Sequence, residues 1–212
     1  MNHLTTEKIS YFCGEVFDFF ILNICWISGT LLGGLIFGYA PSTIALFTVL
    51  RDKIMAAEKR GVASTYWMIY KKEFKKGNLL GMIVTLFACV IYINQANFKV
   101  DEDHFFVILT TISTMAQWLL ILVILYLFPM YVHYETTLTN YIRFSFSFVF
   151  LKPHITFFLA LWCWLIYSLF VIIPGLIPFF GVSLLAFGIM AINYQLFMRN
   201  ETDLRANSSK TS

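Results

Sequence analysis

Residues 19–50 read FFILNICWISGTLLGGLIFGYAPSTIALFTVL and contain no Asp, Glu, Lys or Arg, whereas residues 51–76 read RDKIMAAEKRGVASTYWMIYKKEFKK. The second segment carries eight basic residues, namely Arg51, Lys53, Lys59, Arg60, Lys71, Lys72, Lys75 and Lys76. Three later segments, 79–98, 105–132 and 155–198, are again free of these charges. Because about 20 apolar residues cross the hydrocarbon core of a bilayer, this alternation predicts an integral membrane protein with one strongly basic loop.

The composition excludes a water-soluble domain. Of the 212 residues, 59% are hydrophobic and only 13% are charged, whereas soluble domains carry roughly 25% charged residues. The four cysteines form no CxxC pair, so neither a zinc site nor a disulfide framework is indicated, and no cofactor is expected. The net charge of only +3, with the basic residues close to apolar segments, argues against nucleic-acid binding.

The apolar segments predict an all-α, polytopic fold. The last segment is too long for one crossing and is divided at Pro174 and Pro178, because paired prolines interrupt a helix. The prediction is therefore one transmembrane domain over residues 1–200, followed by a polar C-terminal tail at 201–212. Its five spans are placed at about 19–40, 79–98, 105–130, 155–173 and 179–198.

Two segments between the first two spans are expected to form interfacial helices on the cytoplasmic side. Residues 41–59 begin with a proline, which suits a first helical turn, and then show apolar residues at helical spacing. Residues 64–76 combine aromatic and basic residues, as helices on an anionic leaflet do. The alternative for 41–59 is a short second crossing, which would place the N-terminus inside.

The basic residues also set the expected orientation. The loop at 51–76 is by far the most basic, while 96–104 has one lysine against three acidic residues, and the tail after Met198 has three basic residues. The positive-inside rule then predicts a multi-pass protein of a cell membrane, with the N-terminus outside and the C-terminus cytoplasmic.

No reactive constellation is evident within the spans. No Asp, Glu, Lys, Arg or His falls mid-span, which argues against a pump coupled to protons or ions. His133, Glu135 and His154 lie near one predicted face, but a solvated interfacial histidine is the commoner case, and no ligand spacing supports a metal site. HExxH, GxSxG and Walker A motifs are absent from the sequence, so no enzyme is predicted and no catalytic residue is assigned.

Polar and small residues within the spans have packing as their expected role. Asn23, Gln117 and Asn193 either form hydrogen bonds between helices, the default, or line a path for a polar solute. The first span carries two interleaved glycine pairs, Gly29/Gly33 and Gly34/Gly38, at the spacing that lets helix backbones approach closely. An internal contact is favoured for them, and an oligomer remains open.

The chain resembles the YesL family of bacterial integral membrane proteins. The resemblance is carried by Asn23 and Trp26 in the first span and by Gly38, Pro41, Ser42, Thr43 and Ala45 at the break that follows, together with the Phe74-Lys-Lys segment. Where other members often have a proline before this break, the chain has Gly33-Gly34. The family has no established activity, but its genes often lie beside sugar-uptake and polysaccharide-degradation genes, which implies an accessory role in carbohydrate use.

These observations predict a non-enzymatic inner-membrane protein that assists or regulates carbohydrate uptake. The lipid bilayer and a sugar-transporter component are its expected partners. The expected contact residues with the membrane surface or the partner are Lys71, Lys72, Lys75 and Lys76. The alternative is a small uncoupled carrier or channel for a polar solute.

Overall fold

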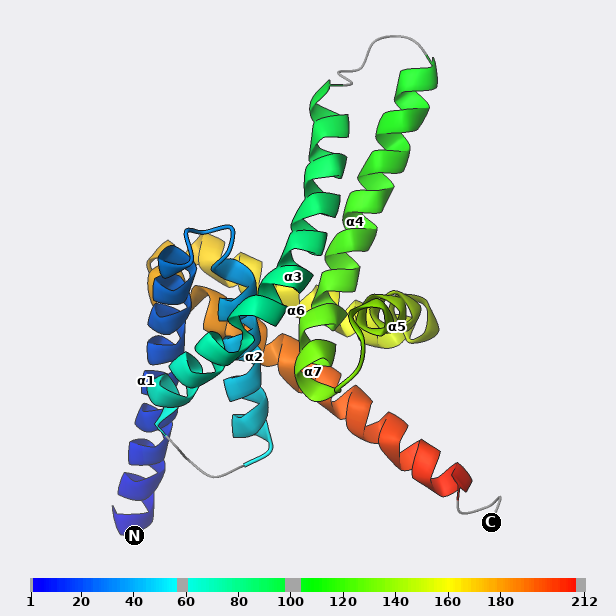
Figure 1. Cartoon of the computed structure of the whole chain (residues 1–212). Coiled ribbons are helices and arrows are strands. Elements are labelled where there is room, and N and C mark those ends of the chain that lie inside the picture. Colours follow the sequence, from blue (N-terminus) through cyan, green and yellow to red (C-terminus); the bar gives the residue numbers. More distant parts are fainter. Residues whose placement is uncertain (1, 57–60, 98–103, 209–212) are drawn as a thin grey trace.

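The computed structural model describes residues 2–56, 61–97 and 104–208, which form seven α-helices and one 3-10 turn without any strand (Figure 1). The elements are α1 (Asn2–Leu32), α2 (Tyr39–Ile54), α3 (Val62–Asn97), α4 (His104–His133), α5 (Leu138–Leu151), α6 (Pro153–Ile172), η1 (Pro174–Leu176) and α7 (Ile177–Ser208). Five helices, α1, α3, α4, α6 and α7, are long and apolar enough to cross a membrane. This confirms the prediction of an all-α, polytopic membrane protein with five such spans.

The first span ends at Leu32 rather than at residue 40, because a tight turn separates α1 from α2. Gly34 and Leu35 both have left-handed backbone conformations, with φ of 68° and 64°, a region that favours glycine. A Cβ atom on Gly33 would lie 2.2 Å from the Cα atom of Gly38. Three of the four glycines expected to pack helices therefore serve this turn, and only Gly29 lies within a helix.

Helix α2 occupies the centre of the bundle, contrary to the interfacial helix predicted for residues 41–59. It packs against α1, α3, α4 and α7. Between its start and Leu50 its side chains are apolar or small, so the helix has no polar face to turn toward water. Its buried residues are Ala40, Pro41, Ser42, Ile44, Ala45, Leu46, Phe47, Val49 and Leu50.

Helices α1 and α2 run antiparallel. Lys53, in the last turn of α2, forms ion pairs with Glu15 at 3.0 Å and with Asp18, both in the first half of α1. Burial opposes the charge on Lys53, but hydrogen bonds and the charges of both carboxylates outweigh it, so the pKa of Lys53 lies above its usual value. The N-terminal half of α1 therefore lies beside the end of α2 that leads into the basic loop, and both chain termini lie at this end of the molecule (Figure 1).

Helix α3 is one continuous helix of 36 residues, so the segment predicted as a separate interfacial helix at 64–76 is its first half. Two glycines four residues apart bring α3 against α2. A Cβ atom on Gly77 would lie 2.8 Å from the Cδ1 atom of Ile44, and one on Gly81 would lie 2.4 Å from the Cβ atom of Ala40. The hydroxyl of Tyr39 donates to the carbonyl of Gly81 at 2.6 Å. The close contact between α2 and α3 therefore depends on a glycine pair that the sequence analysis did not single out.

The last two spans form the predicted hairpin, and a third glycine allows their close contact. The ring of Trp162 in α6 covers Gly188 in α7, where a Cβ atom would lie 2.0 Å from the ring. The indole N–H of Trp162 also donates to the carbonyl of Leu185 at 3.2 Å. Helices α3 and α4 form a second hairpin, which projects beyond the other helices (Figure 1).

The glycine contact between α2 and α3 can be tested by Gly81→Ala. In an exposed helix this exchange stabilises by up to about 1 kcal/mol, but here the added methyl group overlaps Ala40. We expect the free energy of unfolding to fall by about 1–3 kcal/mol, as in overpacked cores, which thermal unfolding of the detergent-purified protein would measure. Gly14→Ala in α1, where nothing lies within 4 Å of the new Cβ atom, is the matched control and should not lower the midpoint. Equal midpoints for both variants would contradict the proposed tight contact.

Candidate functional site

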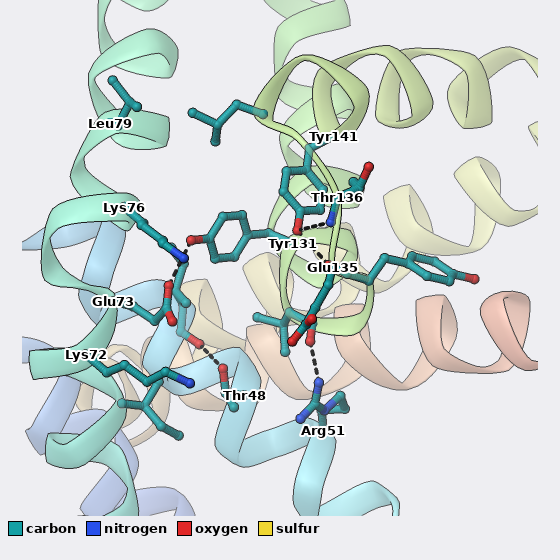
Figure 2. Close-up of a pocket in the computed structure, with 15 residues that line it drawn as sticks. Thr48, Arg51, Lys72, Glu73, Lys76, Leu79, Tyr131, Glu135, Thr136 and Tyr141 are labelled. Atoms are coloured by element: carbon teal, nitrogen blue, oxygen red, sulfur yellow. Dashed lines mark hydrogen bonds between the residues drawn. The ribbon is translucent and has the colours of Figure 1, made fainter.

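A charged pocket of about 750 Å³ lies between the second half of α2, the first half of α3, the end of α4 and the link to α5 (Figure 2). We call it the charged pocket and define it by the polar residues that line it. Apolar side chains form the rest of its wall. Each of the four elements contributes to this lining. Its polar residues are Thr48, Arg51, Lys72, Glu73, Lys76, Tyr131, Tyr134, Glu135, Thr136 and Tyr141.

Arg51 joins α2 to the end of α4. Its guanidinium group donates to the carbonyl of Val132 and forms an ion pair with Asp52 at 2.9 Å. The last four carbonyl groups of a helix have no partner within the helix, and cations near that end are favoured by the helix dipole. Arg51 therefore caps α4 and at the same time places one positive charge on the floor of the pocket.

Helix α3 presents a row of side chains to the pocket at helical spacing. Lys72, Glu73 and Lys76 share this face, since residues three and four apart lie next to one another on a helix. The carboxylate of Glu73 accepts a hydrogen bond from the hydroxyl of Tyr131 in α4 at 2.8 Å. This bond ties α3 to α4 across the pocket and leaves the two ammonium groups of the row to either side of it (Figure 2).

The link between α4 and α5 is held by Tyr141. Its hydroxyl donates to the carbonyl of Tyr134 at 2.6 Å and accepts from the amide of Thr136 at 3.0 Å. Its ring contacts that of Tyr131, with 5.0 Å between centroids. Burial, and then the negative charge of Glu201, raise the pKa of Tyr134, so its hydroxyl stays neutral at physiological pH. The link is therefore held by Tyr141, and Tyr134 adds no charge to this side of the pocket.

The pocket retains binding capacity beyond these structural bonds. Its lining has three cationic and two anionic side chains. Arg51 and Glu73 are held as described, whereas Lys72, Lys76 and Glu135 have no ion pair or hydrogen bond with another residue that the structure describes. Charge-assisted hydrogen bonds to an acidic or hydroxyl-rich group would satisfy these three side chains. The arrangement is therefore suited to binding a polar group.

The four lysines expected to contact a membrane surface or partner divide between two faces of α3. Lys72 and Lys76 line the pocket, whereas Lys71 and Lys75 do not. All four side chains are exposed. The sequence analysis placed all four lysines on one predicted helix. It did not show that two of them line a pocket to which Arg51 contributes from another helix.

Three of the residues that carry the family resemblance, Asn23, Trp26 and Thr43, form structural joints away from this pocket, whereas Lys76 of the Phe74-Lys-Lys segment lines it. The indole N–H of Trp26 donates to the hydroxyl of Thr43 at 3.1 Å, which joins α1 to α2. The side chain of Asn23 donates to the carbonyl of Pro178 at 2.8 Å and accepts from the amides of Val182 at 2.9 Å and Ser183 at 3.3 Å. It thereby supplies partners for backbone groups in the first turns of α7, where a helix has unpaired N–H groups.

The three polar residues considered for a solute path do not meet. Asn23 is occupied by α7, and Asn193 donates to the carbonyls of Leu125 at 3.2 Å and Ile189 at 2.8 Å. Asn193 lies ten residues beyond Ser183 on α7, which is about 15 Å along a helix. Gln117 lies on an exposed part of α4. Both asparagines thus have the packing role that was the default expectation.

The candidate metal ligands also lie apart. His133 contacts Glu201 through its Nε2 atom at 3.2 Å and stacks on Phe197. Glu135 lines the charged pocket, and His154 lines a different groove between α6 and α7. Within the described residues, no three His, Cys, Asp or Glu side chains are grouped so as to hold one metal ion.

Comparison with known proteins gives full-length relatives. The family described as "Protein of unknown function, DUF624" matches residues 19–95. The chain is 31% identical to the uncharacterised protein YesV of Bacillus subtilis (strain 168) over 95% of this chain and 97% of that protein. It is 35% identical to YteU of the same organism, over 90% and 85%, and 26% identical to YesL, over 93% of each. No solved structure matches the chain.

The bond between Tyr131 and Glu73 predicts the effect of Tyr131→Phe. Loss of the hydroxyl leaves a half-buried carboxylate without its donor, so we expect the free energy of unfolding to fall by about 1.5–3 kcal/mol, as for hydrogen bonds to charged groups. Tyr167→Phe removes the hydroxyl of a tyrosine that is 68% exposed and should leave stability unchanged. Thermal unfolding in detergent compares the two, and a second exchange, Glu73→Gln, should lessen the cost of Tyr131→Phe. Additive effects of the two exchanges would contradict the bond.

Proposed function

The chain belongs to the DUF624 family together with YesV, YteU and YesL, and on that premise we propose that it is a non-enzymatic membrane protein that assists or regulates carbohydrate uptake. The carbohydrate role is supported by the resemblance to the YesL family, whose genes often lie beside sugar-uptake genes. The observation that carries the accessory role is the charged pocket. Lys72, Lys76 and Glu135, which have no charged partner among the described residues, form a concave polar surface at the end of an apolar bundle, as expected for a docking site.

The pocket is better suited to docking than to chemistry. Arg51, Tyr131 and Tyr141 are engaged in bonds that join α2, α3, α4 and the link to α5, so the backbone that carries the pocket's other charged residues is preorganised. An acidic segment of a transporter component would pair with Lys72 and Lys76, while Glu135 would select for a partner that also carries a positive or hydroxyl group. The separation of Asn23 from Asn193 supports this role over that of a carrier.

We also propose that both termini are cytoplasmic, in place of the predicted external N-terminus. The antiparallel contact between Lys53 and Asp18 places the first half of α1 beside the end of α2 that leads to the basic loop. The contact between Glu201 and His133 places the end of α7 beside the end of α4 at the charged pocket. If the basic loop is cytoplasmic, as the positive-inside rule requires, both ends of the chain share its side, and α2 returns through the bundle.

Reporter fusions test this orientation. A cytoplasm-active reporter, such as a fluorescent protein, should be active at either terminus, whereas a reporter active only outside the membrane should be inactive at both. The same pair of reporters at residue 100, between α3 and α4, should give the reverse pattern, because α3 carries the chain across. An externally active reporter at the N-terminus would restore the original prediction and would exclude α2 as a returning helix.

Copurification from native membranes tests the docking role. We expect the protein to enrich a component of a sugar transporter relative to an unrelated five-span protein. Lys72→Glu with Lys76→Glu should lower recovery about thirtyfold or more, since disrupting a desolvated charge pair costs 2–5 kcal/mol. The control is Lys71→Glu with Lys75→Glu, which makes the same change of charge on the face of α3 outside the pocket and should retain the partner.

Two results would contradict the proposal. If no transporter component is enriched by the unaltered protein, the accessory role fails. If the two charge reversals reduce recovery equally, the partner responds to the overall charge of α3, and the charged pocket is not its docking site.

A further inference from the structure

A second groove, of about 670 Å³, lies between α6 and α7 and is separate from the charged pocket. One end is basic and polar and is lined by Lys152, His154, Arg199 and Asn200. The remainder runs along α6 and α7 and is mostly apolar. Phe158, Leu161 and Leu165 are its exposed apolar side chains, and Gln195 of α7 is its one polar residue among those that the structure describes. The groove therefore combines a cationic mouth with an apolar stem along a helix that is apolar enough to span a membrane.

The mouth has no built-in counter-charge. Among the residues that the structure describes, no Asp or Glu lines the groove. Neither Lys152 nor Arg199 forms an ion pair with another residue that the structure describes, whereas Lys53, on α2, is paired with two carboxylates. Two positive charges that converge on one cavity repel each other unless an anion lies between them. The mouth is thus complementary to a negatively charged group that comes from outside this part of the chain.

The groove lies at the same end of the molecule as the charged pocket. Phe197, two residues before Arg199 in α7, contacts the rings of His133 and Tyr134 at the end of α4. Tyr134 in turn lines the charged pocket. With the orientation set by the basic loop, the mouth faces the cytoplasmic leaflet, whose anionic lipids attract basic residues near the surface.

We propose that this groove binds one anionic phospholipid, with its phosphate between Lys152 and Arg199 and an acyl chain along Phe158, Leu161 and Leu165. The lipid is favoured over a free phosphate because the apolar stem continues directly from the basic mouth and opens on the outer face of a spanning helix. A free phosphate would leave that stem empty. The inference rests on this groove and on the orientation proposed above, and it is independent of the docking role proposed for the charged pocket.

Native mass spectrometry of the full-length protein in an uncharged detergent tests the site. The protein is titrated with phosphatidylglycerol and with phosphatidylcholine of the same acyl chains, and the first binding step is measured. We expect phosphatidylglycerol to bind more tightly. Lys152→Gln with Arg199→Gln should weaken that step about thirtyfold, from the contribution of two basic residues to anionic-lipid binding, while phosphatidylcholine binding stays unchanged. Lys71→Gln with Lys75→Gln removes the same charge elsewhere and should change neither.

A second variant tests the stem without altering charge. Leu161→Trp adds bulk in the apolar part of the groove and leaves Lys152 and Arg199 in place. Because the acyl chain would lose its space, the exchange should weaken phosphatidylglycerol binding by at least tenfold. The charge variant and Leu161→Trp change different parts of the groove. If one of them fails to fold, the other still tests the site. Glycerol phosphate, which has the anionic group without acyl chains, should not displace the lipid.

Three outcomes would overturn the proposal. Equal binding of the two lipids would show that the net negative charge of phosphatidylglycerol does not contribute to binding. An equal loss in the Lys71 and Lys75 control would assign the effect to overall charge. If glycerol phosphate displaces the lipid at the same concentrations at which phosphatidylglycerol binds, the groove is a site for a soluble phosphate. Failure of the docking experiments on Lys72 and Lys76 would leave this groove unaffected, since none of its lining residues belongs to the charged pocket.

Discussion

The close packing of α2 against its neighbours is the constraint on which the rest of the structure depends. Glycines permit it on both sides. Gly29 in α1 faces the hydroxyl of Ser42, to which an added Cβ atom would come within 2.6 Å, and Gly77 and Gly81 in α3 face Ile44 and Ala40. Without a hydrophobic drive between helices inside a bilayer, such close backbone approach and the hydrogen bonds it allows are the main source of association. Tyr70, for example, donates from α3 to the carbonyl of Gly29 at 2.8 Å.

The position of α2 also determines the charged pocket. Because the helix passes through the centre and ends beside α4, Arg51 reaches the unpaired carbonyl end of α4 at Val132. The row of α3 that contains Glu73 then lies opposite Tyr131. A surface-lying helix at 41–59 would have directed these charges toward lipid headgroups and would have left the end of α4 without its cap. The same packing that buries α2 therefore assembles the polar site.

The sequence motif shared with the YesL family acts through these same contacts. Trp26 and Thr43 join α1 to α2, and Asn23 supplies hydrogen bonds to the start of α7. Replacing this buried amide by an apolar residue would remove three hydrogen bonds between α1 and α7, each worth about 0.5–1.5 kcal/mol. The motif residues are thus best understood as determinants of helix arrangement, and the polar binding surfaces lie elsewhere, in the charged pocket and in the groove between α6 and α7.

The sequence by itself determined the membrane class, the five spans and the basic segment, because hydropathy and charge are local properties that a 20-residue window records. It also determined the division of the last apolar run at Pro174 and Pro178, since proline acts on its own helix. The sequence did not distinguish a buried helix from an interfacial one at 41–59, because the period of apolar residues is the same in both. Only the tertiary structure showed that α2 has four neighbouring helices and that α3 continues as one helix through Gly77. It also showed that Arg51, Glu73 and Tyr131 come together from three helices. The reason is physical: contacts between distant segments depend on backbone approach and helix direction, which one glycine or one returning helix can change without altering the hydropathy of any span.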